Sequence, residues 1–116
     1  MSVPIAATFV TKRHSRRPYL RLAVTNSSGV AFDFTGAVGV TFVMYDEAGT
    51  QKVKSPGVIE TPLANGVLKY EWAAVDVDTA GEFRAEFDVS YGVGDPMTLP
   101  LDGYIMVKVY ADLDGA

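Results

Sequence analysis

The sequence predicts an all-β fold, an antiparallel β-sandwich of about seven to eight short strands. Three observations support this prediction. Hydrophobic and polar residues alternate along most of the chain, turn residues recur about every eight to twelve residues, and no stretch has the periodicity of a long helix. A chain of 116 residues, of which 48% are hydrophobic, is long enough for one domain with its own core.

Several segments have the composition and alternation of strands. They cover residues 19–25, 38–46, 50–54, 57–63, 67–72, 83–91 and 103–113. Turn residues separate them, and the Asn65-Gly66 pair predicts a tight hairpin because both residues tolerate a positive φ. The predicted sandwich therefore occupies residues 19–113, and a short tail follows at 114–116.

The strand at 83–91 and the corner before it resemble strand F of an immunoglobulin-like sandwich. An antibody domain has a tyrosine and a cysteine there, whereas this chain has Phe83 and Ala85. Because the whole chain lacks cysteine, packing alone must hold the predicted immunoglobulin-like fold together. Trp72, Phe83 and Phe87 are the expected centre of that packing, and the alternative for Trp72 is an exposed platform that stacks on a sugar.

Residues 1–18 are expected to form a basic N-terminal arm or a leading strand. Five of the ten Lys and Arg residues lie in the first 21 residues, which contain no acidic residue, although the chain has a net charge of −4. We expect an extended arm that docks on an acidic protein surface, with a solvated arm as the alternative. Nucleic acid is not the expected partner because aromatic residues are not interleaved with the basic ones. The residues predicted to make this contact are Lys12, Arg13, Arg16 and Arg17.

The last predicted strand carries an unusual outer row, formed by Tyr104, Met106 and Tyr110. These side chains are too apolar for a row that faces only water. Either the N-terminal segment at residues 4–10 covers the row, or the row contacts a partner. We expect part of it to contact a partner.

No group of residues predicts an enzyme, a cofactor site or a metal site. His14 is the only histidine and lies in the basic segment, where a catalytic group would not be held in place. Two Asp-x-Asp pairs, Asp76 with Asp78 and Asp112 with Asp114, supply too few oxygens for calcium. These aspartates are expected to lie in turns or caps.

Three stretches carry a resemblance to a known family. They are VTFVMYDEAGT, NGVLKYEWAAVDVDTAGEFRAEFDVSYGVG and MTLPLDGYIMVKV, within a similarity that covers roughly residues 19 to 112. Together they resemble the immunoglobulin-like N-terminal domain of the phage baseplate upper protein family and related small tailed-phage virion proteins. The resemblance implies a sandwich that attaches to neighbouring proteins of the particle.

We therefore expect a non-enzymatic structural protein of a tailed-phage virion, serving tail or baseplate attachment or head decoration through protein-protein contacts. Its partners would be other virion proteins and further copies of itself, without contact to a membrane. It would be located in the virion and assembled in the bacterial host cytoplasm. The alternative is a carbohydrate-binding or adhesin-type sandwich, which would bind a glycan.

Overall fold

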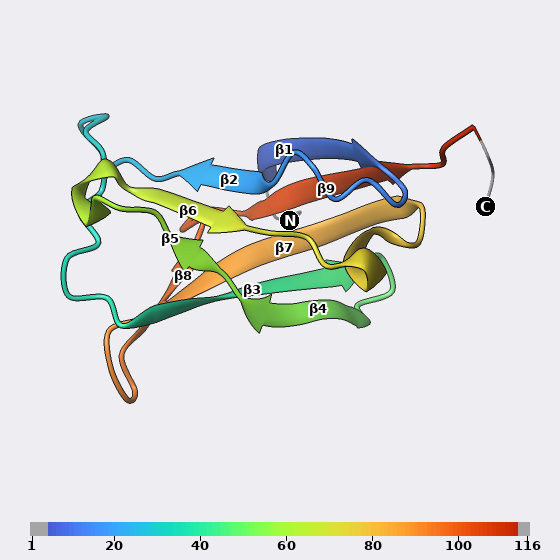
Figure 1. Ribbon diagram of the computed structural model, residues 1–116. Helices are drawn as coiled ribbons and strands as arrows, with labels where there is room; N and C mark the ends of the chain where they lie inside the picture. The colour runs from blue at the N-terminus through green and yellow to red at the C-terminus, as the bar shows by residue number, and fades with distance from the viewer. Residues whose placement is uncertain (1–4, 114–116) are drawn as a thin grey trace.

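Two β-sheets pack face to face in the computed structural model, which describes residues 5–113 (Figure 1). The large sheet has the strand order β1-β9-β7-β3-β4, and β8 pairs with β7 beyond the end of β9. Its strands are β1 (Ile5–Lys12), β3 (Gly39–Asp46), β4 (Gln51–Pro56), β7 (Gly81–Ser90), β8 (Pro96–Leu99) and β9 (Tyr104–Tyr110).

The small sheet has the order β2-β6-β5 and covers one face of the large sheet. Its strands are β2 (Leu20–Ala23), β5 (Val58–Ile59) and β6 (Val67–Tyr70). Two 3-10 helices, η1 (Leu63–Asn65) and η2 (Ala74–Val77), lie in the connections before and after β6. The described residues contain no α-helix. The predicted all-β sandwich is confirmed.

One part of the predicted arrangement is wrong, because the sandwich is not antiparallel throughout. β1 pairs with β9 in parallel, with Phe9 opposite Val107 and Thr11 opposite Val109. The two strands lie at opposite ends of the sequence, so no hairpin imposes an antiparallel direction on them. The structure also contains the short strand β8, which was not predicted, and has nine strands in total among the described residues.

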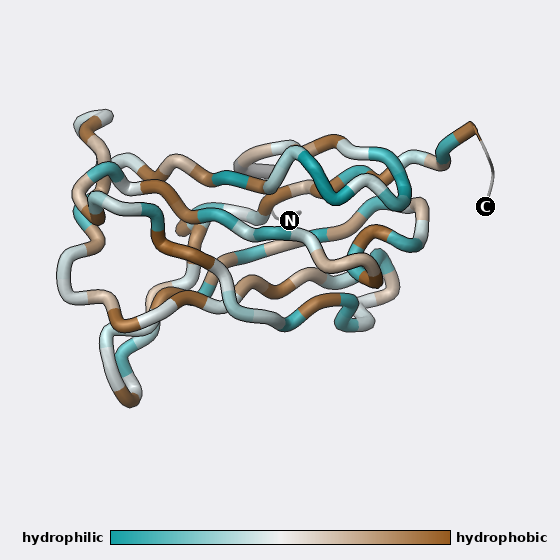
Figure 2. Tube along the Cα trace, viewed as in Figure 1, coloured by the Kyte–Doolittle hydropathy of each residue, from teal (hydrophilic) through white to brown (hydrophobic). Residues whose placement is uncertain are grey.

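The core lies between the two sheets, where the alternation in the sequence directs the hydrophobic side chains. Figure 2 shows hydrophobic and hydrophilic residues alternating along the long strands. Phe87 of β7 and Phe42 of β3 are fully buried and lie opposite each other in register, with ring centroids 5.1 Å apart. Phe83 is also buried.

Trp72 lies in the core immediately after β6, with only 2% of its surface exposed. Its ring contacts those of Phe9, Phe42 and Tyr70, with centroids between 5.2 and 5.7 Å away. The alternative of an exposed sugar-stacking platform at Trp72 is therefore wrong. The alternation in 67–72 puts Trp72 on the same side as Leu68 and Tyr70, which are also buried.

A buried tyrosine and aspartate stabilise the corner after β6. The Tyr70 hydroxyl donates a hydrogen bond to the carboxylate of Asp76 in η2. The same carboxylate accepts the backbone N–H of Ala73 at 2.8 Å. Asp78 faces elsewhere and forms an ion pair with Lys52 at 2.6 Å. The Asp-x-Asp pair is thus divided between a buried cap and a surface ion pair, as the expected turn role requires.

The buried Tyr70 hydroxyl predicts a loss of stability at alkaline pH. Burial and the hydrogen bond to Asp76 raise the pKa of Tyr70 well above its ordinary value of 10.0. The unfolded chain therefore releases this proton at a lower pH than the folded chain, and the free energy of unfolding falls as the pH rises above about 10. We expect Tyr70→Phe to be less stable at neutral pH but to lose less stability in the alkaline range.

Urea denaturation between about pH 8 and about pH 12 would test this prediction. Burial also raises the pKa of Tyr91, so part of the alkaline loss should remain in Tyr70→Phe. Two curves of stability against pH that run parallel would contradict the assignment to Tyr70.

The connection between β5 and β6 is longer than the predicted tight turn at Asn65-Gly66. The flanking strands pair as expected, with Ile59 opposite Leu68. The connection, however, contains η1 and then Gly66, whose φ of 69° is left-handed. The Gly66 carbonyl accepts the backbone N–H of Val24, and the Val24 carbonyl accepts the backbone N–H of Phe32, both at 2.8 Å. Gly66 thus joins this turn to the segment after β2.

Candidate functional site

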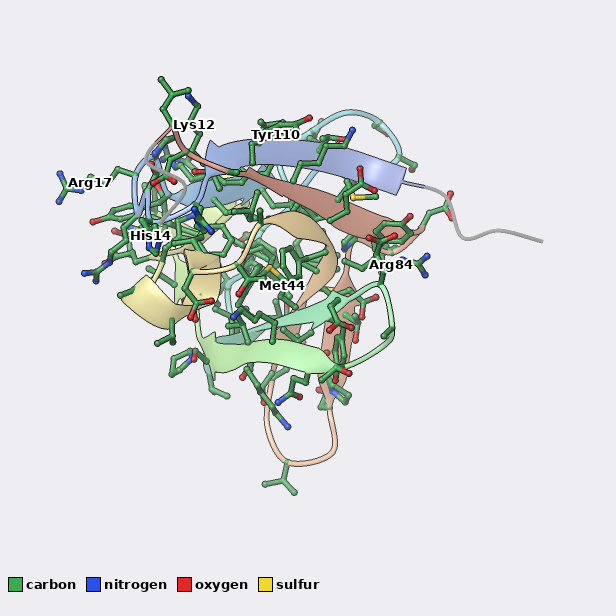
Figure 3. All side chains as sticks on the ribbon, turned by 90° about the vertical axis from the view of Figure 1, so that its right-hand side faces the viewer. Lys12, His14, Arg17, Met44, Arg84 and Tyr110 are labelled. Carbon is green, nitrogen blue, oxygen red and sulfur yellow. The ribbon has the colours of Figure 1, made fainter. Side chains whose placement is uncertain are left out.

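The residues predicted to form a partner surface fall on two sides of the molecule. Figure 3 shows Arg17 on the side opposite Arg84, with Lys12 and Tyr110 between them along the top. Lys12 and Tyr110 are opposite each other in the β1-β9 register, so they lie together at one end of the large sheet. Arg13 and Arg16 belong with Arg17 on the connection from β1 to β2.

This connection, residues 13–19, is here called the basic loop, and it is attached to the body. The backbone N–H of Arg13 donates to the Tyr110 carbonyl at 2.7 Å, and that of His14 donates to the Val77 carbonyl at 2.8 Å. The Arg13 guanidinium pairs with Asp112 at 3.1 Å and lowers the pKa of that carboxyl group.

The expectation of an extended arm is therefore wrong for residues 13–18. Pairing of β1 with β9 brings the chain out beside the end of β9 and beside η2, where backbone and carboxylate partners are within reach. Arg16 adds a further attachment, because its Nε donates to the Trp72 carbonyl at 2.9 Å. Arg16 and Arg17, which the loop presents, therefore project from a backbone that is fixed to the body of the protein.

A cleft of about 660 Å³ lies between the basic loop and the segment after β6. Arg16 and Arg17 line it and are exposed. Tyr19 forms part of the wall, with the Arg17 guanidinium and the Lys69 ammonium each 5.5 Å from its ring centroid. The full lining consists of Ser15, Arg16, Arg17, Tyr19, Glu71, Trp72 and Ala73. This space is here called the basic cleft.

The basic cleft has an excess of positive charge. Arg16, Arg17 and Lys69 lie in or beside it, and Glu71 is the one carboxylate in its lining. Glu71 is already paired with Lys69 at 3.1 Å. The two arginines can therefore offer N–H donors in a planar fork to a carboxylate or phosphate group of a ligand.

A second, smaller hollow of about 290 Å³ lies on the face of the large sheet that points away from the core. The strand registers place Val43 opposite Glu86 and Tyr45 opposite Arg84, and Arg84 lies opposite Met106 of β9. The full lining consists of Val43, Tyr45, Asp46, Glu47, Gly49, Arg84, Glu86, Gly103 and Tyr104. This space is here called the outer hollow.

The outer hollow combines aromatic rings with an excess of negative charge. The Arg84 guanidinium lies 5.0 Å from the ring centroid of Tyr104. Tyr45 is 38% exposed. Burial, with a contribution from the nearby Asp88, raises the pKa of Glu86. A carboxylate with this shift gains from the approach of a cation.

The row Tyr104, Met106 and Tyr110 remains available on this face. β1 lies beside β9 in the same sheet, with Thr8 opposite Met106, and does not cover the row. Tyr104 and Met106 are half-buried, and Tyr110 is 53% exposed. The alternative in which residues 4–10 cover this row is wrong for the described part of that segment, because the strand protects the edge of β9 instead.

The sequence predicted the basic residues and the row Tyr104, Met106 and Tyr110 as contact residues, but it did not predict most of the residues that line the outer hollow. Tyr45, Arg84 and Glu86 come from two strands whose pairing the sequence does not state. Alternation alone would place Arg84 and Glu86 on the outer face, because Phe83, Ala85 and Phe87 point inward. Tyr19 was missed as a cleft residue because it was placed in the predicted strand at 19–25, and the sequence does not show that residues 71–73 lie near it.

Within residues 5–113, no three or more His, Cys, Asp or Glu side chains gather closely enough to hold a metal ion. Asp114 lies outside the described residues, so its predicted pairing with Asp112 has no structural counterpart here. No helix in the described part of the chain is long and apolar enough to span a membrane.

The fold is similar to a solved structure, the crystal structure of CopC from Methylosinus trichosporium OB3b. The similarity has a TM-score of 0.53 at 12% sequence identity and covers 91% of this chain and 86% of that chain. At this identity the likeness shows the fold alone. No protein-family model matches the sequence, and no curated protein matches it.

The prediction of a tailed-phage structural protein is wrong. A solved structure that shares the fold over 91% of this chain is that of CopC, which is not a phage structural protein. The alternation and turn residues on which the prediction depended specify a sandwich, and a sandwich serves many unrelated functions. Of this prediction, only the β-sandwich fold is confirmed.

Proposed function

We propose that this protein is a non-enzymatic binding module whose basic cleft recognises a carboxylate-rich segment of a partner protein. The observation that carries the proposal is the position of Arg16 and Arg17 in a cleft of about 660 Å³. Both residues are exposed, and the Arg17 guanidinium lies over the ring of Tyr19. The cleft thus offers charge, planar donors and an aromatic wall together.

The contacts of the basic loop preorganise its arginine side chains for binding a carboxylate ligand. Arg16 is oriented by its Nε donating to the Trp72 carbonyl, and Arg17 by its position over Tyr19. A side chain that is already oriented loses less conformational entropy when it binds a ligand. A mobile arm with the same charges would bind an acidic segment more weakly.

Carboxylates suit the cleft better than an apolar ligand does. The two arginines can each bind a carboxylate through two N–H groups, whereas Lys69 beside Tyr19 is already paired with Glu71. Exposed charge pairs contribute only about 0.2–1 kcal/mol each, so several must form together and the affinity should fall with salt.

Binding of a hexaglutamate peptide at low salt, followed by calorimetry and by NMR shifts of the loop amides, would test the proposal. We expect the double variant Arg16→Ser/Arg17→Ser to bind about tenfold more weakly, which corresponds to about 1.4 kcal/mol. The matched control is Lys54→Ser/Lys108→Ser, which removes the same charge from the opposite sheet face and should retain the affinity.

Equal weakening in both double variants would show a general charge effect and would contradict a specific cleft. Tight binding of an oligonucleotide, lost in Arg16→Ser/Arg17→Ser while hexaglutamate does not bind, would assign the cleft to phosphates and would also overturn the proposal.

A further inference from the structure

We infer that copies of this chain associate head to tail, with the basic loop of one copy entering the outer hollow of the next. The inference rests on the proposed function, because it names a second copy as the carboxylate-bearing partner. Such association requires two surfaces of opposite charge and groups in the hollow that can bind an arginine side chain. It also requires that the loop and the hollow lie far enough apart for one copy to bind two neighbours.

The charges of the chain are divided in the way such a contact needs. The first 21 residues contain five basic and no acidic residues, and the remaining residues contain five basic and fourteen acidic ones. The basic loop presents Arg16 and Arg17 in exposed positions. Opposite charges on two surfaces of one molecule favour association between copies, chiefly by raising the rate of encounter.

The outer hollow has the groups that receive an arginine side chain. Tyr104 already holds the Arg84 guanidinium against its ring, which shows that the ring can serve as a cation-binding surface. Tyr45, from β3, is a second ring in the lining and is 38% exposed. Glu47 and Glu86 supply carboxylates to its lining.

The Asp46 carboxylate is less available, because it accepts the backbone N–H groups of Ala48 and Thr50, both at 2.9 Å. These bonds hold the β3-β4 turn that forms one side of the hollow. Both bonds use Asp46 Oδ1, so an incoming arginine would meet Glu47 and Glu86 together with the other oxygen of Asp46. A hollow of about 290 Å³ suits an inserted side chain better than a large ligand.

The positions of the two surfaces determine the kind of assembly. Figure 3 shows Arg17 of the basic loop and Arg84 of the outer hollow on opposite sides of the molecule. A contact between different surfaces of two copies is heterologous, so each copy can bind one neighbour through its loop and another through its hollow. The expected product is a ring or an open chain of copies.

Sedimentation velocity of the full chain at increasing concentration and low salt would test the inference. We expect the mean mass to rise with concentration and the rise to disappear at high salt. The loop variant Arg16→Ser/Arg17→Ser and the hollow variant Glu47→Gln/Glu86→Gln should each remain monomeric. The control Asp33→Asn/Asp95→Asn makes the same charge change away from the hollow and should associate like the unmodified chain.

Mixing the two monomeric variants is the decisive measurement. The loop variant keeps an intact hollow and the hollow variant keeps an intact loop, so the mixture should form a dimer of one copy of each that grows no further. A mixture that stays monomeric would overturn the inference, and so would association of either variant alone.

The result also separates the inference from the proposed function. If the unmodified chain stays monomeric at every concentration but hexaglutamate binds the basic cleft, the second copy is not the partner and the proposed function stands. If hexaglutamate does not bind while the loop variant associates as the unmodified chain does, both proposals are wrong.

Discussion

Replacing Gly66 by alanine is expected to lower the free energy of unfolding by about 2–5 kcal/mol. A Cβ atom at this position would lie 2.6 Å from the Phe32 carbonyl oxygen and 2.7 Å from both the Phe32 nitrogen and the Val24 carbonyl oxygen. These are backbone atoms, so no side-chain rotation can relieve the contact. The φ of 69° adds the cost of a left-handed conformation for alanine.

Gly49→Ala separates the two contributions. Gly49 also has a positive φ, of 86°, but a Cβ atom there would have no neighbour within 4 Å. We expect this control to lose only about 1–2 kcal/mol, the cost of the backbone conformation. Urea denaturation of both variants would measure the difference, and equal losses would show that the turn moves freely away from residues 24 and 32.

Phe87→Ala is expected to lower the free energy of unfolding by about 3–5 kcal/mol. Phe87 is fully buried at the centre of β7, and its ring packs against that of Phe42. Removing the ring loses its burial and leaves a cavity that the two sheets cannot close, because both are held by backbone pairing. A variant this destabilised could fail to fold at 37 °C.

The neighbouring residue provides the control for Phe87→Ala. Glu86 lies on the opposite face of the same strand, so Glu86→Ala should change the free energy of unfolding by no more than about 0.5 kcal/mol. Denaturation midpoints measured in urea would compare the two variants. Similar midpoints would mean that β7 presents its faces differently in solution.

The fold was predictable because the alternation of side chains is local. Phe83, Ala85 and Phe87 point inward, as a strand with one buried face requires, and the turn at 46–49 joins the two strands that flank it in sequence. The direction of β1 was not predictable, because its partner lies at the other end of the sequence and no turn links them. The short strand β8 has too few residues for alternation to reveal it, and the strand predicted at 57–63 is reduced to the two residues of β5.

The candidate surfaces were predictable only in part, for a similar reason. The cluster of Lys12, Arg13, Arg16 and Arg17 is visible in the sequence, but its attachment to Asp112 and to the Trp72 carbonyl depends on the folded chain. The outer hollow depends on the register of three strands, and a shift of one residue in any pair would scatter its lining. The sequence therefore shows which charged and aromatic side chains are present, but it does not show which of them the fold brings together.

The parallel pairing of β1 with β9 also orders events during synthesis. β1 hydrogen-bonds to no strand other than β9 in the large sheet, so residues 5–12 have no partner strand until residues 104–110 have been made. At ribosomal rates of about 5–20 residues per second, this delay is roughly 5–20 seconds. β3, β4 and β7 can pair earlier, because they are neighbours in the sheet and precede β9 in the sequence. The attachments of the basic loop to the Tyr110 carbonyl and to Asp112 therefore form only after the last strand emerges, whereas the Val77 and Trp72 carbonyls that also hold the loop are made earlier.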